Sequence, residues 1–186
     1  MRIIGGVFKG KKINFLKNLD TRPLKDSVKE NIFNILTHSN FIKIKIEESY
    51  VLDLYSGIGS FGIECLSRGA KKVTFIEKDQ RASNILKDNL TTLSIISRSK
   101  IINKRIEDTL QGNLNEKFSL FFLDPPFADK SFVNNIKFIR EKKLFETKNI
   151  IIIHREKKTR ENLDKFIEII KVKEYGRSKI IFGFFD

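Results

Sequence analysis

The stretch V51-L-D-L-Y-S-G-I-G-S-F-G62 encodes a strand, a glycine-rich turn and the start of a helix. Residues 51–54 form an apolar run of strand length that carries one carboxylate, and the three glycines satisfy the pattern G-x-G-x-x-G. A helix is predicted over residues 60–68, with Gly69 as its C-terminal stop. This strand–turn–helix unit indicates an α/β fold.

The alternation of strand and helix continues to the C-terminus. Repeated βα units imply a parallel sheet with helices on both faces. The last two strands are joined by too few residues for a crossover, so one of them must run antiparallel. We therefore predict an α/β fold with a doubly wound, mostly parallel seven-stranded sheet and one antiparallel strand near the C-terminus. The predicted strands are 51–54, 72–77, 101–106, 120–123, 150–154, 168–173 and 179–185, and the main helices between them are 60–68, 80–93, 131–144 and 159–166.

The N-terminal segment is basic and favours β structure. Two runs, 2–8 and 11–16, are predicted to form a β-hairpin, and Gly5-Gly6 is expected to mark a bulge or a close backbone approach. Residues 1–25 contain seven bases and one acid, within a 186-residue chain of net charge +13. We expect one domain, 1–186, whose basic arm, 1–25, contacts nucleic acid; a merely solvated surface is the alternative. The residues expected to make these contacts are Arg2, Lys9, Lys11 and Arg22.

Acidic residues are predicted to gather at one rim of the sheet, where the carboxyl ends of the parallel strands meet. The glycine pattern also fits a nicotinamide or flavin dinucleotide, but Asp53 stands where a pyrophosphate would have to approach. A carboxylate repels that ligand and attracts a sulfonium, which favours S-adenosylmethionine. Glu77 would then hold the ribose hydroxyls and Asp108 would lie near the adenine amine. The expected cofactor-binding residues are Asp53, Tyr55, Ser56, Gly57, Gly59, Glu77, Lys78 and Asp108.

A second functional turn is predicted in S119-L-F-F-L-D-P-P-F127. Neither Pro125 nor Pro126 can donate a backbone hydrogen bond, so the strand must stop at Asp124 with a stiff, extended turn behind it. The turn gathers one carboxylate, free carbonyl oxygens and the Phe127 ring around one point, which suits a flat ligand that carries an amine. Asp124, Pro125, Pro126 and Phe127 are the expected catalytic residues, although the motif alone also fits a plain loop.

These motifs resemble those of class I S-adenosylmethionine-dependent methyltransferases. Residues 51–70 and 75–79 resemble their motifs I and II, and D-P-P-F resembles motif IV of enzymes that act on exocyclic amines. The segments R2-I-I-G-G-V-F-K-G-K11 and T21-R-P-L-K-D-S-V-K-E-N-I-F-N-I-L36 sharpen the resemblance. They are similar to the bacterial 16S ribosomal RNA guanine-N2 methyltransferase family, which modifies guanine 966. The resemblance extends to E174-Y-G-R-S-K179 near the C-terminus.

The resemblance implies methyl transfer to the exocyclic N2 amine of a guanine in 16S ribosomal RNA, free or in a small-subunit assembly particle. Asp124 and the Pro125 carbonyl would accept the two amine hydrogens, and Phe127 would stack on the base. Two alternatives stay open: an adenine-N6 DNA methyltransferase, and a catalytically silent RNA-binding or assembly factor. The lack of a separate target-recognition domain argues against the first. The intact acidic and D-P-P-F motifs argue against the second.

Composition disfavours several other classes of protein. Cys65 is the one cysteine, which rules out an intramolecular disulfide and fits a reducing setting. No apolar run approaches membrane-spanning length, and no His/Cys cluster suggests a metal site. We therefore expect a cytoplasmic monomer without a metal. His154 has no evident partner in the sequence, and we interpret it as a rim or structural histidine.

Overall fold

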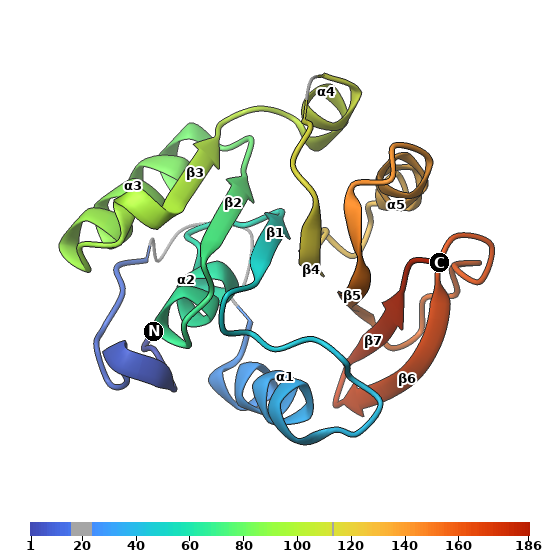
Figure 1. The fold of residues 1–186 in the computed structure, drawn as a ribbon, viewed down its shortest axis with the longest axis horizontal. Helices are drawn as coiled ribbons and strands as arrows, with labels where there is room; N and C mark the ends of the chain where they lie inside the picture. Colours follow the sequence, from blue (N-terminus) through green and yellow to red (C-terminus); the bar gives the residue numbers. More distant parts are fainter. Residues whose placement is uncertain (16–23, 113) are drawn as a thin grey trace.

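The computed structural model describes residues 1–15, 24–112 and 114–186, which form a seven-stranded sheet between two layers of helices (Figure 1). The strands are β1 Tyr50–Leu54, β2 Lys72–Ile76, β3 Ser99–Ile102, β4 Phe118–Leu123, β5 Phe145–Glu156, β6 Glu168–Tyr175 and β7 Ser178–Phe184. The helices are α1 Asp26–His38, α2 Ser60–Ser67, α3 Gln80–Thr92, α4 Ile106–Gln111 and α5 Phe132–Glu141, with the short 3-10 helices η1 Gly6–Phe8 and η2 Ile96–Arg98.

The strands lie in the order β3-β2-β1-β4-β5-β7-β6. β1 to β5 pair in parallel, whereas β7 is antiparallel to both of its neighbours, β5 and β6. The predicted fold class, with its one antiparallel strand, is confirmed. The strand order reverses between β1 and β4, which is where a doubly wound sheet opens a crevice for a ligand.

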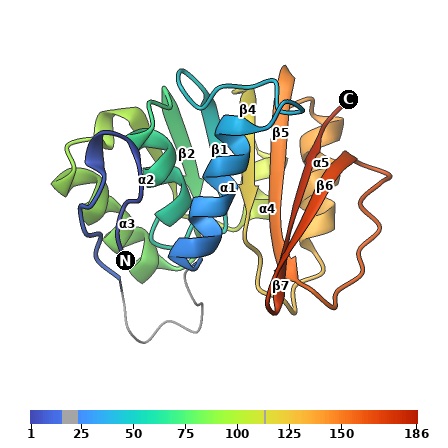
Figure 2. The same cartoon turned by 90° about the horizontal axis from the view of Figure 1, so that it is seen from below.

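Successive residues of the central strands face opposite helical layers. Val51 of β1 packs in a cluster with α1, α2 and α3, whereas Leu52 packs with α4 and α5. β5 follows the same alternation, with Ile152 in the first cluster and Ile153 in the second. Figure 2 shows α1 lying across the face of the sheet that carries the first cluster. Because both faces are covered, these strands are near-continuous apolar runs in the sequence.

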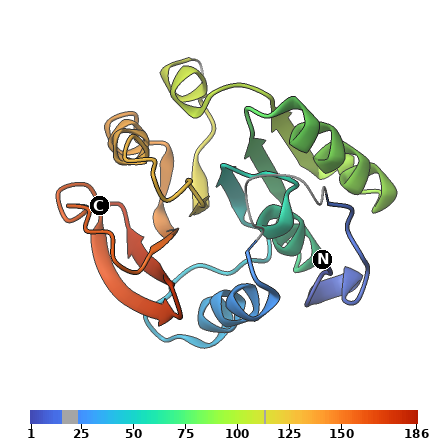
Figure 3. The same cartoon turned by 180° about the vertical axis from the view of Figure 1, so that it is seen from behind.

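The part of the N-terminal arm that precedes residue 16 packs beside α2 instead of forming a regular hairpin (Figure 3). Its antiparallel pairing is short: one bridge joins Arg2 to Lys12, and backbone hydrogen bonds run from Ile3 to Lys11 and from Ile13 to Met1. The 3-10 helix η1 interrupts the first predicted strand beyond this pairing. The backbone amides of Ile4 and Gly5 donate to the Glu64 carboxylate at 2.8 and 2.7 Å, so neither amide is free for a strand ladder. The second predicted run ends at residue 16, outside the described residues.

The close backbone approach expected at the glycine pair is confirmed at Gly6. Its φ is 73°, and a Cβ at this position would lie 1.9 Å from the Ser67 carbonyl oxygen of α2. The conformation and the spacing each require glycine. The arm can therefore lie directly on the helix that follows the glycine loop.

Buried charges hold the arm against α1 and α2. Glu64 is fully buried and pairs with Arg68 Nε at 3.0 Å and with Lys29 Nζ at 3.8 Å. Lys29 Nζ also donates to the Arg2 carbonyl at 3.0 Å. Burial lowers the pKa of Lys29, while the Glu64 and Asp26 carboxylates oppose that shift. The arm is therefore anchored by this chain's own groups.

Two further predicted elements differ in the structure. Residues 159–166 were predicted to be helical but form turns and extended chain, in which Glu161 pairs with Arg155 at 2.8 Å and Leu163 enters the core. The predicted strand 101–106 is replaced by β3 at Ser99–Ile102, and Ile106 begins α4. Among the described residues, no helix is long and apolar enough to span a membrane.

Candidate active site

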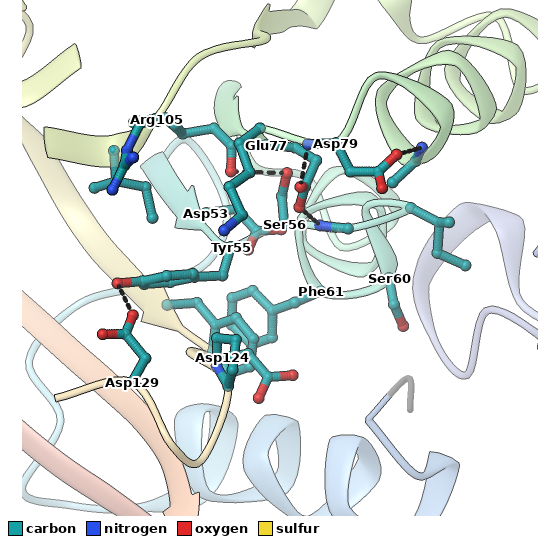
Figure 4. A pocket seen from close by; sticks show the side chains of 18 of the residues that line it. Asp53, Tyr55, Ser56, Ser60, Phe61, Glu77, Asp79, Arg105, Asp124 and Asp129 are labelled. Carbon is teal, nitrogen blue, oxygen red and sulfur yellow. Dashed lines mark hydrogen bonds between the residues drawn. The ribbon is translucent and has the colours of Figure 1, made fainter. Parts of the chain in front are cut away.

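A cleft of about 450 Å³ opens at the carboxyl ends of β1 and β4, where the strand order reverses. Figure 4 shows side chains from the glycine loop, the end of β2 and the loop after β4 around it. Six acidic and three basic residues line the cleft, which favours a ligand with positive charge. The acidic residues are Asp53, Glu77, Asp79, Glu107, Asp124 and Asp129, and the basic ones are Lys78, Arg81 and Arg105.

Asp53 supplies a buried carboxylate from the end of β1. Its side chain accepts a hydrogen bond from the Gly62 amide at 2.9 Å, at the start of α2. Burial raises the pKa of Asp53 well above its usual value; the Gly62 amide opposes this shift, and the charges of Asp124 and Glu77 add to it. A bound cation would stabilise the ionised form. This carboxylate is therefore suited to a positively charged ligand.

Glu77 shapes the glycine loop. Its carboxylate accepts from the Gly57 amide and from the Asp79 amide, each at 2.8 Å. Gly57 has a φ of 53° and nothing within 4 Å of its Cβ position, so the loop leaves open space at the cleft wall. The Ser56 amide donates to the Ile76 carbonyl at 3.1 Å and ties the loop to β2. The backbone of residues 56–58 can therefore be approached by a ligand in the cleft.

Tyr55 links the two sides of the cleft. It adopts a φ of 60° directly after β1, and its hydroxyl donates to Asp129 Oδ2 at 3.1 Å (Figure 4). Asn135 Nδ2 of α5 donates to the same hydroxyl at 3.0 Å. Burial raises the pKa of Tyr55, so the phenol keeps its proton. Burial acts against ionisation of Asp129 too, but hydrogen bonds from Ser131 and Tyr55 hold its pKa below the usual value.

Asp124 is paired with His154, a contact that the sequence interpretation missed. Asp124 Oδ1 lies 2.7 Å from His154 Nδ1, so the prediction of a histidine without a partner is wrong. The register explains the contact: Leu123 of β4 is paired with Ile153 of β5, and the next residue of each strand faces the same side. Asp124 Oδ2 makes no hydrogen bond within the described part of the chain, which leaves it available to a ligand.

The loop after β4 is held by Arg155. Its guanidinium donates to the carbonyls of Pro126 at 3.1 Å, Phe127 at 3.0 Å and Asp129 at 3.2 Å, with a longer contact to Pro125 at 3.5 Å. The Phe127 ring is 41% exposed and meets the His154 ring edge to face, at 5.6 Å between centroids. An exposed aromatic ring therefore lies against His154, the residue that contacts Asp124.

Eight of the twelve residues predicted for cofactor binding and catalysis line this cleft. The lining includes Asp53, Tyr55, Ser56, Gly57, Glu77, Lys78, Asp124 and Pro126. Gly59 lies just beneath it, where its φ of 83° precedes α2 and a Cβ would lie 2.3 Å from Leu86 Cδ1. Pro125 and Phe127 flank the lining within the same loop. Asp108 is exposed on α4 and does not line the cleft, whereas Ile106 and Glu107 of the same helix do.

The structure adds lining residues that the motifs did not indicate. Phe61 and Phe122 stack on each other at 4.0 Å between centroids and form an apolar wall. Phe15 from the end of the arm and Leu24 just before α1 also line the cleft. Of the predicted nucleic-acid contacts, Arg2, Lys9 and Lys11 are exposed on the arm, and Arg22 lies outside the described residues. No group of three or more metal-binding side chains occurs in the ranges described above.

The sheet order, the acidic glycine-loop cleft and the D-P-P-F turn together define a Rossmann-like methyltransferase. A solved structure described as "Putative methyltransferase yhhF from Escherichia coli" matches with a TM-score of 0.85 and 27% identity, over 98% of this chain and 96% of that one. A Haemophilus influenzae structure described as a "putative methylase" matches with a TM-score of 0.77 and 34% identity, over the same shares of the two chains.

Residues 1–183 match the family model described as Conserved hypothetical protein 95, and the chain belongs to that family. The Ribosomal RNA small subunit methyltransferase D of Haemophilus influenzae is 38% identical over 84% of this chain and 79% of its own length. A Bacillus subtilis relative, "Putative rRNA methyltransferase YlbH", is 31% identical over 84% of this chain and 83% of its own. The resemblance to bacterial ribosomal RNA methyltransferases is thereby confirmed.

Proposed function

We propose that this chain transfers a methyl group from S-adenosylmethionine to the exocyclic N2 amine of a guanine in small-subunit ribosomal RNA. The observation that carries the proposal is the position of Asp124, on the rim of the acidic cleft beside an exposed aromatic ring. A carboxylate oxygen and a ring placed together match the two needs of an aromatic amine, which are a hydrogen-bond acceptor and a stacking surface.

The glycine-loop side of the cleft fits the cofactor. S-adenosylmethionine supplies an electrophilic methyl group on a sulfonium when it is bound. The excess of acidic groups suits that positive charge, and the buried Asp53 carboxylate gains most from a nearby cation. Each Glu77 oxygen accepts one amide hydrogen bond and has a second lone pair that could accept from a ribose hydroxyl. The aromatic wall of Phe61 and Phe122 offers an apolar surface between the two sides of the cleft.

The D-P-P-F side of the cleft prepares the acceptor. The exocyclic amine of guanine is a weak nucleophile because its lone pair is delocalised into the ring. Asp124 Oδ2 accepts one N–H and stabilises the positive charge that grows on nitrogen as the methyl group is attacked. His154 holds the other carboxylate oxygen and so fixes the direction of the free one. Most of the rate acceleration then comes from positioning, because no strong base is needed before transfer.

The arm supplies the contacts that favour RNA. Lys9 and Lys11 are exposed, and Lys11 Nζ lies 5.1 Å from the Phe8 ring centroid, which holds its charge at the surface of η1. Val7, between them and the glycine pair, is 79% exposed and adds an apolar contact. Cations beside an exposed apolar side chain suit a phosphate backbone with unstacked bases. The target guanine must leave its stack to reach the cleft.

Mass mapping of the product tests the proposal directly. The purified protein is incubated with labelled S-adenosylmethionine and, in parallel, with 16S ribosomal RNA, partly assembled small subunits and double-stranded DNA. We expect label on one guanine of the ribosomal RNA, at N2. Label confined to DNA adenine would replace guanine with the adenine-N6 alternative, and RNA binding without any transfer would support a silent assembly factor.

A further inference from the structure

We propose that Arg155 is a positioning residue that sets the backbone of residues 125–129 and so prepares the acceptor side of the site before RNA binds. The inference rests on the proposed methyl transfer and adds to it a residue that touches neither cofactor nor target. Arg155 lies on β5, one residue beyond His154. It belongs to none of the sequence motifs from which the site was predicted. Its role comes from what its guanidinium contacts.

Every donor of the Arg155 guanidinium is used. Nε donates to Glu161 Oε1 at 2.8 Å. The remaining contacts go to four loop carbonyls, with Nη1 shared between Pro125 and Pro126 and Nη2 between Phe127 and Asp129. A guanidinium carries five N–H donors in a rigid fork, and five acceptors surround this one. The D-P-P-F loop therefore has four consecutive or near-consecutive carbonyls fixed by a single planar group.

The charge is buried and compensated, which makes the arrangement rigid. Arg155 is 1% exposed, and its guanidinium carbon lies 4.5 Å from the centre of the Phe132 ring of α5. Glu161, which also lies 3.8 Å from Lys179 Nζ, supplies the opposite charge. A buried guanidinium that loses one partner is strongly destabilised, so it resists any loop movement that would break a contact. Glu161 belongs to residues 159–166, which the sequence pattern predicts to be helical. In the structure this segment is not helical, and Glu161 contacts Arg155.

Alternation along β5 gives its last residues different tasks. His154 contacts the Asp124 side chain, whereas Arg155 contacts Phe132 of α5 and holds the main chain that follows Asp124. The two residues therefore fix the side chain and the backbone of one motif from opposite faces of the sheet. Lysine in place of Arg155 would keep the charge but present its donors from one point, so it could not span four carbonyls.

The first experiment compares Arg155→Lys with the matched surface variant Arg140→Lys, whose guanidinium on α5 contacts the Lys165 carbonyl and Asp186 away from the cleft. We expect Arg155→Lys to lower kcat by about 10–100-fold, the scale on which small misplacements act, while the cofactor Kd stays within about threefold. Arg140→Lys should leave both values unchanged. A kcat for Arg155→Lys within twofold of the parent would overturn the proposal.

A second measurement needs no substrate and separates this proposal from the choice of target base. The chain has no tryptophan, so Phe127→Trp creates a single reporter on the loop. When Arg155 is intact, we expect the fluorescence of the introduced tryptophan to keep a high anisotropy, because the loop moves little. When Arg155→Lys is added, we expect this anisotropy to fall at temperatures below the unfolding transition. Equal anisotropy in the two folded proteins would refute the positioning role even if guanine proves to be the target. A loss of anisotropy with methylation of another base would keep the role and change only the substrate.

Discussion

The glycine loop and the D-P-P-F loop lie at the same edge of the sheet, but side chains of opposite charge type shape them. On the cofactor side, the carboxylates of Glu77 and Asp53 collect backbone N–H groups of Gly57, Asp79 and Gly62. On the acceptor side, the Arg155 cation collects backbone carbonyls. One loop is organised through its donors and the other through its acceptors.

Local composition explains this difference. A glycine-rich turn offers several accessible N–H groups, which a carboxylate can gather. Pro125 and Pro126 have no N–H, so their loop can be held only by a group that donates. The result also suits the chemistry that we propose, in which negative charge on one side attracts a sulfonium and Asp124 on the other side accepts from the target amine. Each loop is therefore held by a side chain that matches the backbone groups its sequence leaves available: acidic side chains for N–H groups and an arginine for carbonyls.

The largest expected effect comes from Asp124→Ala on the acceptor side. Loss of the carboxylate removes the acceptor for the target amine, so we expect methyl transfer to fall by about 10²–10³-fold, as for removal of a group that stabilises charge in the transition state. Cofactor affinity should stay within about threefold, because the glycine loop is held by other residues. Transfer of labelled methyl and calorimetry give the two values. Equal loss of cofactor binding would place Asp124 on the cofactor side instead.

Glu77→Ala should reverse that pattern on the cofactor side. Two amide hydrogen bonds to a charged group disappear together with the expected ribose contacts, so we expect cofactor affinity to fall about 10–100-fold. Saturating cofactor should restore kcat to within about threefold of the parent. Glu116→Ala, which removes a carboxylate paired with Lys72 and Lys100 outside the cleft, is the control. A loss of kcat that persists at saturating cofactor, with normal cofactor affinity, would contradict the assignment of Glu77 to cofactor binding.

The exposed lysines of the arm, Lys9 and Lys11, should affect RNA binding alone. For Lys9→Ala with Lys11→Ala we expect weaker RNA binding and a salt dependence whose slope falls by about 1.4–1.8, the value for two lost phosphate contacts. Lys137→Ala with Lys148→Ala removes the same charge from α5 and the start of β5 and should leave the slope unchanged. Titrations at several salt concentrations measure it. An unchanged slope in the arm variant would mean that its charges are only solvated.

Asp53→Asn should have the smallest effect in size but an informative pH dependence. The folded pKa of Asp53 is raised above its unfolded value, so its contribution to stability is present at low pH and is lost as pH rises through the folded pKa. The variant should therefore melt about 2–4 °C above the parent at neutral pH for each kcal/mol recovered, with the difference shrinking towards pH 4. Thermal scans across that range measure it. A constant difference would show that burial of the charge is not the cause.

Much of the fold and half of the site follow from local sequence patterns. The seven strands, the antiparallel β7 and the glycine loop come from apolar runs and turn residues that act over a few positions. Asp53, Glu77 and Asp124 were predictable because each ends a strand of a parallel sheet, where geometry brings strand ends together. The same rule, applied to adjacent strands, could also have paired His154 with Asp124.

The features that escaped prediction depend on distant partners. Residues 159–166 have helix-forming composition, but Glu161 compensates the buried Arg155 charge and the segment stays extended. Asp108 differs from Glu107 by one position on a short helix, and 100° of rotation sends it into solvent. The arm's amides look free for a β-ladder until Glu64, some 60 residues away, takes them. Local propensity gives no information about such contacts.

The anchoring of the arm has a consequence for how this chain folds during synthesis. The backbone amides of Ile4 and Gly5 need Glu64 as their hydrogen-bond acceptor. The Asn14 amide needs Asn89, which is 75 residues further along the chain. The arm precedes α2 and α3 in the chain and therefore cannot be secured until these helices have also left the ribosome. Its cationic side chains are meanwhile exposed in an unfolded chain beside ribosomal RNA. Because these contacts span 59 to 75 residues, the arm should dock late in folding, although it is made before the helices that hold it.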